Sequence, residues 1–351
     1  VDERQDPVTV RQIIERLATK ARSTPDGLGR LSIDVVQEAY REIVGALPDE
    51  DGQALLLRLP GLAASAAEDG TRSFMDSQFA SAARAGDIVS FLREPFSFNT
   101  DIFLDTQSAL GEAGREVIQS LRMNGQMPDG NVKAACEALR NRSHPAQLSM
   151  DIASSLLENG DGELLGRIVV DGAIEDDLFI EDEGNLSSIT FSECVFGRVY
   201  LEGISSYSSI PRFGNCVIGV LSGIGREDGV PESFSSADIS SVVTGSETND
   251  AIMTLNLAEP AKVLLTVLNK VHIQKGSGRQ TSALYRGLDP RASKFVPEVL
   301  KLVEKEGLAT CARMRGKEVW LPNRSLSGRV KRILSAPLLS KDPIMTMASA
   351  I

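Results

Sequence analysis

The residue types that most often carry out chemistry are sparse in this sequence and widely separated. The two histidines, His144 and His272, lie far apart. The cysteines are also dispersed, and none form a Cys-x-x-Cys pair: Cys136, Cys194, Cys216 and Cys311. A zinc site needs clustered ligands, and disulfides belong to oxidising compartments. We therefore expect small buried cysteines in a reducing, cytoplasmic compartment, and no metal or other cofactor in this chain.

Phosphate-binding and nucleophile motifs are missing as well. Residues 276–282, Gly-Ser-Gly-Arg-Gln-Thr-Ser, come closest to a GxxxxGK[ST] loop, but they are too short and lack the lysine. No GxSxG nucleophile elbow is present. Acidic runs at residues 175–177 and 181–183 could bind a divalent cation, but they lack EF-hand spacing, and such runs are more often solvated turns. We predict that this chain is not by itself an enzyme.

Charge is distributed unevenly along the chain. Residues 257–351 contain 17 Lys and Arg against 7 Asp and Glu, a net charge of +10. Residues 1–256 therefore hold 20 against 41, a net charge of −21. This change indicates a domain boundary, and only the C-terminal part has the charge to bind a polyanion. No apolar run is long enough to span a bilayer, so we expect no membrane partner.

Periodicity and composition predict a multi-domain α+β protein with five segments. Antiparallel helix pairs joined by short loops predict a HEAT-like or bundle arrangement before the β-region. The segments are a helical region at residues 1–98, helical hairpins at 99–162, a β-rich region at 163–245, a winged helix at 257–335 and a tail at 336–351.

The β-rich region contains a weak internal repeat. Residues 194–204 resemble residues 216–224 at an offset of 22, with one residue missing in the second copy. Short strands at this period predict the coils of a short parallel β-solenoid, in which each coil buries its apolar face on the next. The alternative is an ordinary antiparallel sheet with a chance similarity.

The C-terminal segment has the pattern of a winged helix. Helices are predicted at residues 259–272 and 281–288, and a third is predicted between Ser293 and Gly307. Strands at residues 308–315 and 318–321 follow, joined by a turn at Gly316-Lys317. Three helices and a hairpin define this fold.

Basic residues of this segment are the candidate binding site. The third helix carries an outer stripe that includes three lysines, and other cations lie in the hairpin and in the preceding loops. In a DNA-binding winged helix these elements contact the major groove and the phosphates. The stripe has no Asn or Gln to recognise adenine, which favours a protein partner, with DNA as the alternative. The candidates are Lys275, Arg279, Arg286, Arg291, Lys294, Lys301, Lys305, Arg313, Arg315 and Lys317.

Several short strings together resemble the C-terminal portion of bacterial NACHT-type STAND NTPases, relatives of the NOD-like receptors. The helical region contributes LLLRLPGL, DGTRSFMD and FASAARAGD, and the β-rich region contributes FGNC. The C-terminal segment contributes GSGR, ALYRGL and VWLPNR. Residues 1–98 then resemble the helices that follow the nucleotide-binding core in such proteins.

The resemblance implies a sensor or regulatory part of a nucleotide-switched protein in bacterial signalling or antiphage defence. The family's Walker A lysine and Walker B acids have no counterparts here, so no nucleotide-binding residue is assigned. If the chain is a fragment, its partners include an NTPase module upstream of Val1. The alternative function is that of a winged-helix transcriptional regulator that binds DNA.

Overall fold

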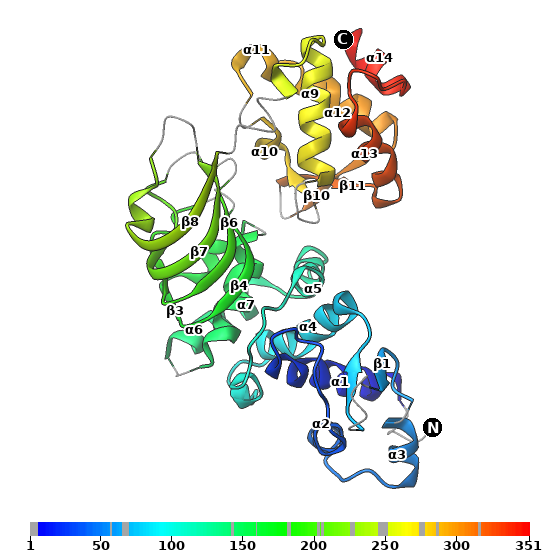
Figure 1. Cartoon of the computed structure of the whole chain (residues 1–351), viewed down its shortest axis with the longest axis vertical. Coiled ribbons are helices and arrows are strands. Elements are labelled where there is room, and N and C mark those ends of the chain that lie inside the picture. The colour runs from blue at the N-terminus through cyan, green and yellow to red at the C-terminus, as the bar shows by residue number, and fades with distance from the viewer. Residues whose placement is uncertain are drawn as a thin grey trace. The chain divides into compact units, whose positions relative to one another are not determined.

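The computed structural model is a mixture of helices and strands. It describes residues 6–56, 58–64, 70–141, 144–158, 160–180, 184–201, 204, 207–224, 229–244, 252–273, 278–285, 288–314 and 317–351. The chain forms two compact units. Unit 1 is Val1–Tyr200, Ser206–Leu221 and Pro231–Ser241, and unit 2 is Leu201–Ser205, Ser222–Val230 and Val242–Ile351. Figure 1 shows the elements of both units.

Unit 1 begins with helices that have the expected polar caps. The side chains of Asp6, Ser32 and Asp76 each accept a hydrogen bond from a backbone N–H in the first turn. The elements are α1 Pro7–Lys20, α2 Ile33–Val44, α3 Glu50–Leu56, β1 Leu62–Ala64, β2 Arg72–Phe74 and α4 Ser77–Arg93.

The expected helical region at residues 1–98 is mostly helical, but it also contains two short strands that were not predicted. Strands β1 and β2 pair antiparallel, and Leu31 forms an antiparallel bridge to Arg72 on the other edge of β2. Strands of three residues are too short to show a period of two, so their pairing depends on contacts that sequence periodicity does not report.

The next helices lie within residues 99–162, the segment expected to be helical. They are α5 Glu112–Met123, α6 Asp129–Asn141 and α7 Ala146–Glu158, with short 3-10 turns at Thr100–Phe103 and Gly162–Leu165. Helix α7 is unusual because every residue from Gln147 to Glu158 is buried. Its polar residues therefore need partners within the protein.

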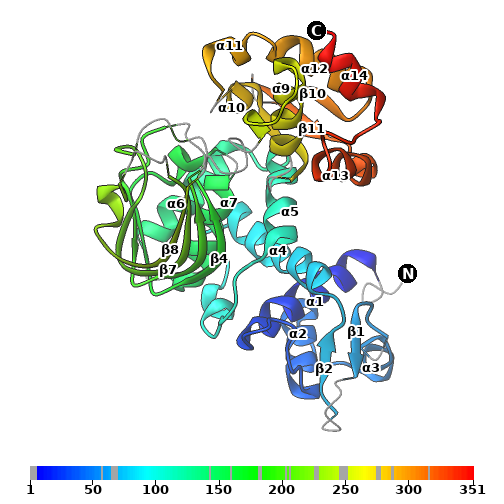
Figure 2. The same ribbon diagram turned by 45° about the horizontal axis from the view of Figure 1, so that its top comes forward.

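A parallel sheet follows, and its strands lie side by side in a curved stack (Figure 2). The strands are β3 Ile168–Asp171, β4 Ile174–Phe179, β5 Ile189–Ser192, β6 Val195–Tyr200, β7 Arg212–Ile224 and β8 Ser236–Thr244. Ile168 pairs with Ile189 and Thr190 with Arg212, so successive coils are offset by 21 or 22 residues. These pairs exclude the antiparallel alternative and give the region a β-solenoid-like arrangement.

Two features of the repeat have a steric explanation. A Cβ on Gly197 would lie 2.6 Å from the carbonyl oxygen of Asp176, and one on Gly219 would lie 2.6 Å from that of Gly197. Glycine at this position therefore lets successive coils approach closely. At the corner of each coil one residue has a left-handed backbone conformation with positive φ: Gly172, Glu193 and Asn215.

Stacked aromatic rings fill the interior of the coils. Phe191 and Phe213 stack with ring centroids 5.2 Å apart, and Phe213 and Phe234 stack at 4.3 Å. All three are buried. Because no coil can enclose these rings alone, the ladder makes the stability of each coil depend on its neighbours.

The C-terminal module in unit 2 contains α9 Glu259–Leu268 with a π-helical extension to Ile273, β9 Arg279–Gln280, α10 Thr281–Tyr285, α11 Pro290–Ser293, α12 Val296–Lys305, β10 Ala309–Met314 and β11 Lys317–Pro322. The antiparallel strand order is β10-β11-β9. Met314 pairs with Lys317, so residues 315 and 316 connect the strands, one position before the predicted turn. Both lie outside the described residues.

Two further helices complete this unit. They are α13 Ser327–Ser335 and α14 Pro343–Ser349. Ile344, Met345 and Ala348 of α14 are buried in the same core as α9 and α12. The expected tail at residues 336–351 therefore includes a helix that belongs to the core.

The order of elements in unit 2 repeats that at the start of unit 1. Residues 259–322 run helix, strand, helix, helix, strand, strand, apart from the short α11, and the last strand lies between the other two. Residues 7–74 run α1, the bridge at Leu31, α2, α3, β1 and β2, with β2 in the middle. Each module has its own hydrophobic core.

The aromatic ladder predicts which residues of β7 matter for stability. We expect Phe213→Ala to lower the free energy of unfolding by about 3–5 kcal/mol, because it leaves a cavity between two rings. Val217→Ala, on the exposed face of the same strand, should cost less than ~1 kcal/mol. Urea denaturation followed by circular dichroism measures both. Equal losses for the two variants would contradict the ladder's role.

Candidate functional site

The predicted basic residues of the C-terminal module have different environments. Lys275, Arg286 and Arg315 lie outside the described residues. The other seven lie on β9 (Arg279), α11 (Arg291), the junction before α12 (Lys294), α12 (Lys301 and Lys305), β10 (Arg313) and β11 (Lys317). Arg291, Lys294, Lys301, Lys305 and Arg313 are exposed.

The exposed face of α12 is balanced in charge rather than basic. Lys301 and Lys305 are exposed, but so are Glu298 and Glu304 of the same helix. Lys294 precedes the helix, and its ammonium lies 4.7 Å from the centroid of the Phe295 ring. Two cations and two carboxylates on one helix create little net attraction for a phosphate backbone.

Arg279 is half-buried and binds the protein backbone, unlike the exposed cations of this module. Its Nε donates a 3.3 Å hydrogen bond to the carbonyl oxygen of Lys270. It therefore links β9 to the π-helical turn after α9.

A further basic segment follows the hairpin, where the sequence had been assigned no site. Helix α13 contains Arg329, Lys331 and Arg332 and no acidic residue. Arg329 is paired with Asp342 at 2.7 Å and with Glu306 at 2.9 Å, which fastens α13 to α14 and α12. Lys331 and Arg332 are exposed. The sequence signal for this surface was the run Arg-Val-Lys-Arg itself.

His272 and three of the four cysteines are buried. His272 Nε2 lies 2.9 Å from the carbonyl oxygen of Leu308, and burial lowers the pKa of His272. Cys136, Cys194 and Cys216 are buried as expected, but Cys311 is exposed on β10, so that part of the expectation is wrong. Cys311 occupies a strand position that alternates to the outer face. In the described part of the chain, no three His, Cys, Asp or Glu side chains could hold a metal ion together.

A pocket in the first module also lacks acid–base groups. It has a volume of about 160 Å³ and lies between α2, α3 and β2. Its lining contains no carboxylate, thiol or imidazole: Leu31, Ile33, Val36, Gln37, Gln53, Leu56, Gly70 and Arg72.

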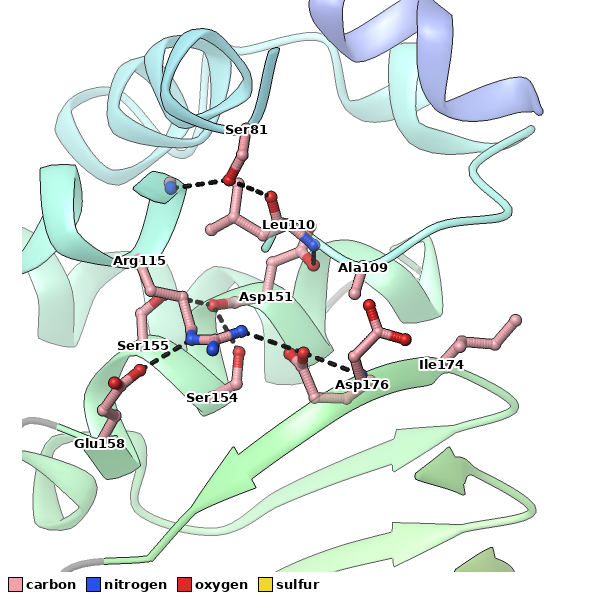
Figure 3. Close-up of polar contacts among 12 residues, drawn as sticks. Ser81, Ala109, Leu110, Arg115, Asp151, Ser154, Ser155, Glu158, Ile174 and Asp176 are labelled. Carbon is pink, nitrogen blue, oxygen red and sulfur yellow. Dashed lines mark hydrogen bonds and ion pairs between the residues drawn. The ribbon is translucent and has the colours of Figure 1, made fainter. Parts of the chain in front are cut away.

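A group of buried charges lies in unit 1, around α7 (Figure 3). Five polar residues of α7 recur at helical spacing and form a buried stripe: Gln147, Asp151, Ser154, Ser155 and Glu158. The sequence pattern alone suggests a solvent-facing stripe. Each residue is instead bonded to another part of unit 1 or to the helix itself.

Asp151 is the central acceptor. Arg22 donates to both of its oxygens, from Nη1 at 2.6 Å and from Nη2 at 2.9 Å, and both side chains are fully buried. The backbone N–H of Leu110 and the amide of Gln147 donate to the same carboxylate. Such saturation offsets the desolvation of a buried ion pair.

Arg115 of α5 bridges α7 and the sheet. Its Nε donates to Glu158 at 2.7 Å, and its Nη1 donates to Glu175 of β4 at 3.0 Å. Glu175 pairs in register with Phe196, so this carboxylate occupies the interior of the first coil. Burial raises the pKa of Glu175 from 4.5 to about 7. The prediction that this acidic run is a solvated turn is therefore wrong for Glu175.

Gln147 protects the backbone of β4, the outer strand of the first coil. Its amide nitrogen donates to the carbonyl oxygen of Ile174 at 2.8 Å, and its amide oxygen accepts from the N–H of Ile174 at 3.0 Å. The side chain thus imitates a neighbouring strand, and α7 closes the first end of the stack. The second acidic run, residues 181–183, lies outside the described residues.

These contacts form a clamp that connects Arg22, α5, α7 and β4. The side chains of this network are buried, and most of their polar atoms bind one another. No family model, no curated protein and no solved structure matches this chain. No helix within the described ranges is long and apolar enough to cross a membrane.

The clamp predicts a pH dependence that Glu175→Gln should remove. Between pH 4.5 and about 7 the folded protein keeps a proton on Glu175 that the unfolded chain releases. Stability therefore falls as pH rises through this window, by on the order of 3 kcal/mol from this group. Glu175→Gln has no proton to release at this position. We therefore expect its unfolding free energy, relative to that of the wild type, to increase as the pH rises from 4.5 to about 7.

Urea denaturation at several pH values measures this difference. Asp171→Asn, at an exposed carboxylate of the same coil, serves as the control and should follow the wild type. A Glu175→Gln variant whose pH dependence is unchanged would contradict the assignment.

Proposed function

We propose that this chain is a recognition and regulatory part of a NACHT-type STAND protein, in bacterial signalling or antiphage defence. Within it, unit 1 serves as a clamped scaffold and the C-terminal module binds a protein partner. The observation that carries the protein-partner part of this proposal is the balanced charge of α12, where Lys301 and Lys305 accompany Glu298 and Glu304. Mixed charge suits a protein surface better than a phosphate backbone.

The arrangement of helices and strands supports a chain built from several separate modules. We propose that residues 259–322 are a winged helix and that residues 7–74 are a second one, because the strand order of the two modules agrees. The parallel offset of 21 or 22 residues supports a short β-solenoid in unit 1. The HEAT-like arrangement of residues 99–162 stays a prediction. Three buried free thiols suit a reducing, cytoplasmic location.

A DNA-binding regulator is the second candidate, and the charge of residues 257–351 favours it. The hairpin cation Arg313 is exposed, as a DNA-contacting wing requires. The exposed carboxylates of α12 argue against DNA binding, because they would enter the major groove together with the lysines and repel the phosphates.

Titration of the chain with duplex DNA separates the two candidates. We expect weak binding at low salt, with a shallow dependence on salt concentration, because α12 has no net charge to release counterions. Fluorescence anisotropy measures the affinity. Tight binding that Lys301→Ala and Arg313→Ala both weaken, while Lys262→Ala on α9 does not, would favour the DNA-binding regulator.

Nucleotide titration tests the regulatory assignment. We expect no binding of ATP or GTP with Mg²⁺ by this chain in isothermal titration calorimetry, and no hydrolysis, because it has no phosphate-binding loop. Hydrolysis abolished by a point mutation within the chain would contradict the proposal.

A further inference from the structure

The turn between α13 and α14 displays two neighbouring leucines to solvent. Leu338 is 57% exposed and Leu339 is 82% exposed, the largest value among the exposed large apolar side chains of the described residues. An exposure this high means that the side chain protrudes from the surface instead of lining a groove. Single exposed apolar residues are common, whereas two adjacent side chains that both protrude form a small apolar contact surface.

Exposed cations flank this tip on both sides in the sequence. Residues 319–351 contain Arg324, Arg329, Lys331, Arg332 and Lys341 against one acidic residue, Asp342, a net charge of +4. Lys331 and Arg332 lie in the last turns of α13, seven and six residues before Leu338, and Lys341 lies two residues after Leu339. All three are exposed.

Arg329 binds both Asp342 and Glu306, so this group of one cation and two carboxylates has a net charge of −1. It offsets only one of the three cations Lys331, Arg332 and Lys341, and the hydrogen bonds from Arg329 hold the pKa of Asp342 below its ordinary value. Of the remaining acids at the end of α12, Glu304 is exposed and is adjacent to the exposed Lys305, which leaves that helix end without net charge. The surface around the leucine pair is therefore positive.

We propose that the leucine tip, formed by Leu338 and Leu339 with Lys331, Arg332 and Lys341, docks on an anionic lipid surface. A bilayer interface accepts protruding apolar side chains without a complementary pocket, and anionic headgroups attract the flanking cations. This contact is peripheral and requires no membrane-spanning helix. It departs from the sequence-based expectation of no membrane partner, and it does not depend on the proposed function.

Vesicle sedimentation with the full chain tests the proposal. We expect the chain to sediment with vesicles that contain phosphatidylserine in phosphatidylcholine and to stay in solution with phosphatidylcholine alone. Leu338→Ser with Leu339→Ser should weaken binding at least tenfold. Lys331→Gln, Arg332→Gln and Lys341→Gln together should do the same, and added salt should weaken wild-type binding.

A matched control comes from β8, where Val242 and Val243 are a second adjacent, exposed apolar pair, 45% and 39% exposed. The described residues around them, 229–244, include no Lys or Arg. Val242→Ser with Val243→Ser should leave vesicle binding unchanged, and thermal melts verify that each variant folds.

Three outcomes would overturn the assignment. They are absence of binding to phosphatidylserine vesicles, equal binding to both kinds of vesicle, and equal loss with the valine control. Binding of a poly-glutamate peptide through the same residues, without vesicle binding, would instead assign the tip to an acidic protein partner.

Discussion

Unit 1 depends on the ion pair between Arg22 and Asp151. Both side chains are fully buried, so each lost its hydration on folding, and an unpaired charge at either position would be strongly destabilising. The pair is tolerated because Asp151 also receives hydrogen bonds from Leu110 and Gln147. Those donors come from a loop and from α7, so the positions of the first helix, the loop and α7 are coupled through one carboxylate.

The same helix connects this clamp to the parallel stack. Gln147 satisfies the backbone of Ile174, and Arg115 reaches past Glu158 to the interior carboxylate of Glu175. A carboxyl group in a core position lowers stability, but Glu175 is bound by Arg115 of α5 and by Ser154 of α7. These interactions specify which surface covers the first coil. Exposed strand edges invite pairing with other chains, and a cap of this kind removes one such edge.

The C-terminal module distributes its charge over two surfaces with different chemistry. Helix α12 carries cations and carboxylates together, whereas α13 and the following turn carry exposed cations beside exposed leucines. The first is suited to another protein and the second to an anionic, apolar interface. Net charge alone, which is +10 for residues 257–351, does not distinguish them, because a surface is defined by which charges are neighbours.

Local patterns in the sequence were sufficient for the capped helices, the offset of 22 residues and the hairpin after α12, because each arises from residues close together in the chain. They were not sufficient for β1 and β2, for the core helix α14, or for the polar stripe of α7. That stripe has the spacing of a solvent-facing surface, yet Asp151 is buried because Arg22 lies 129 residues away in sequence and beside it in space. Only the tertiary structure decides whether such a carboxylate is buried, because the cation that offsets its desolvation is distant in the sequence.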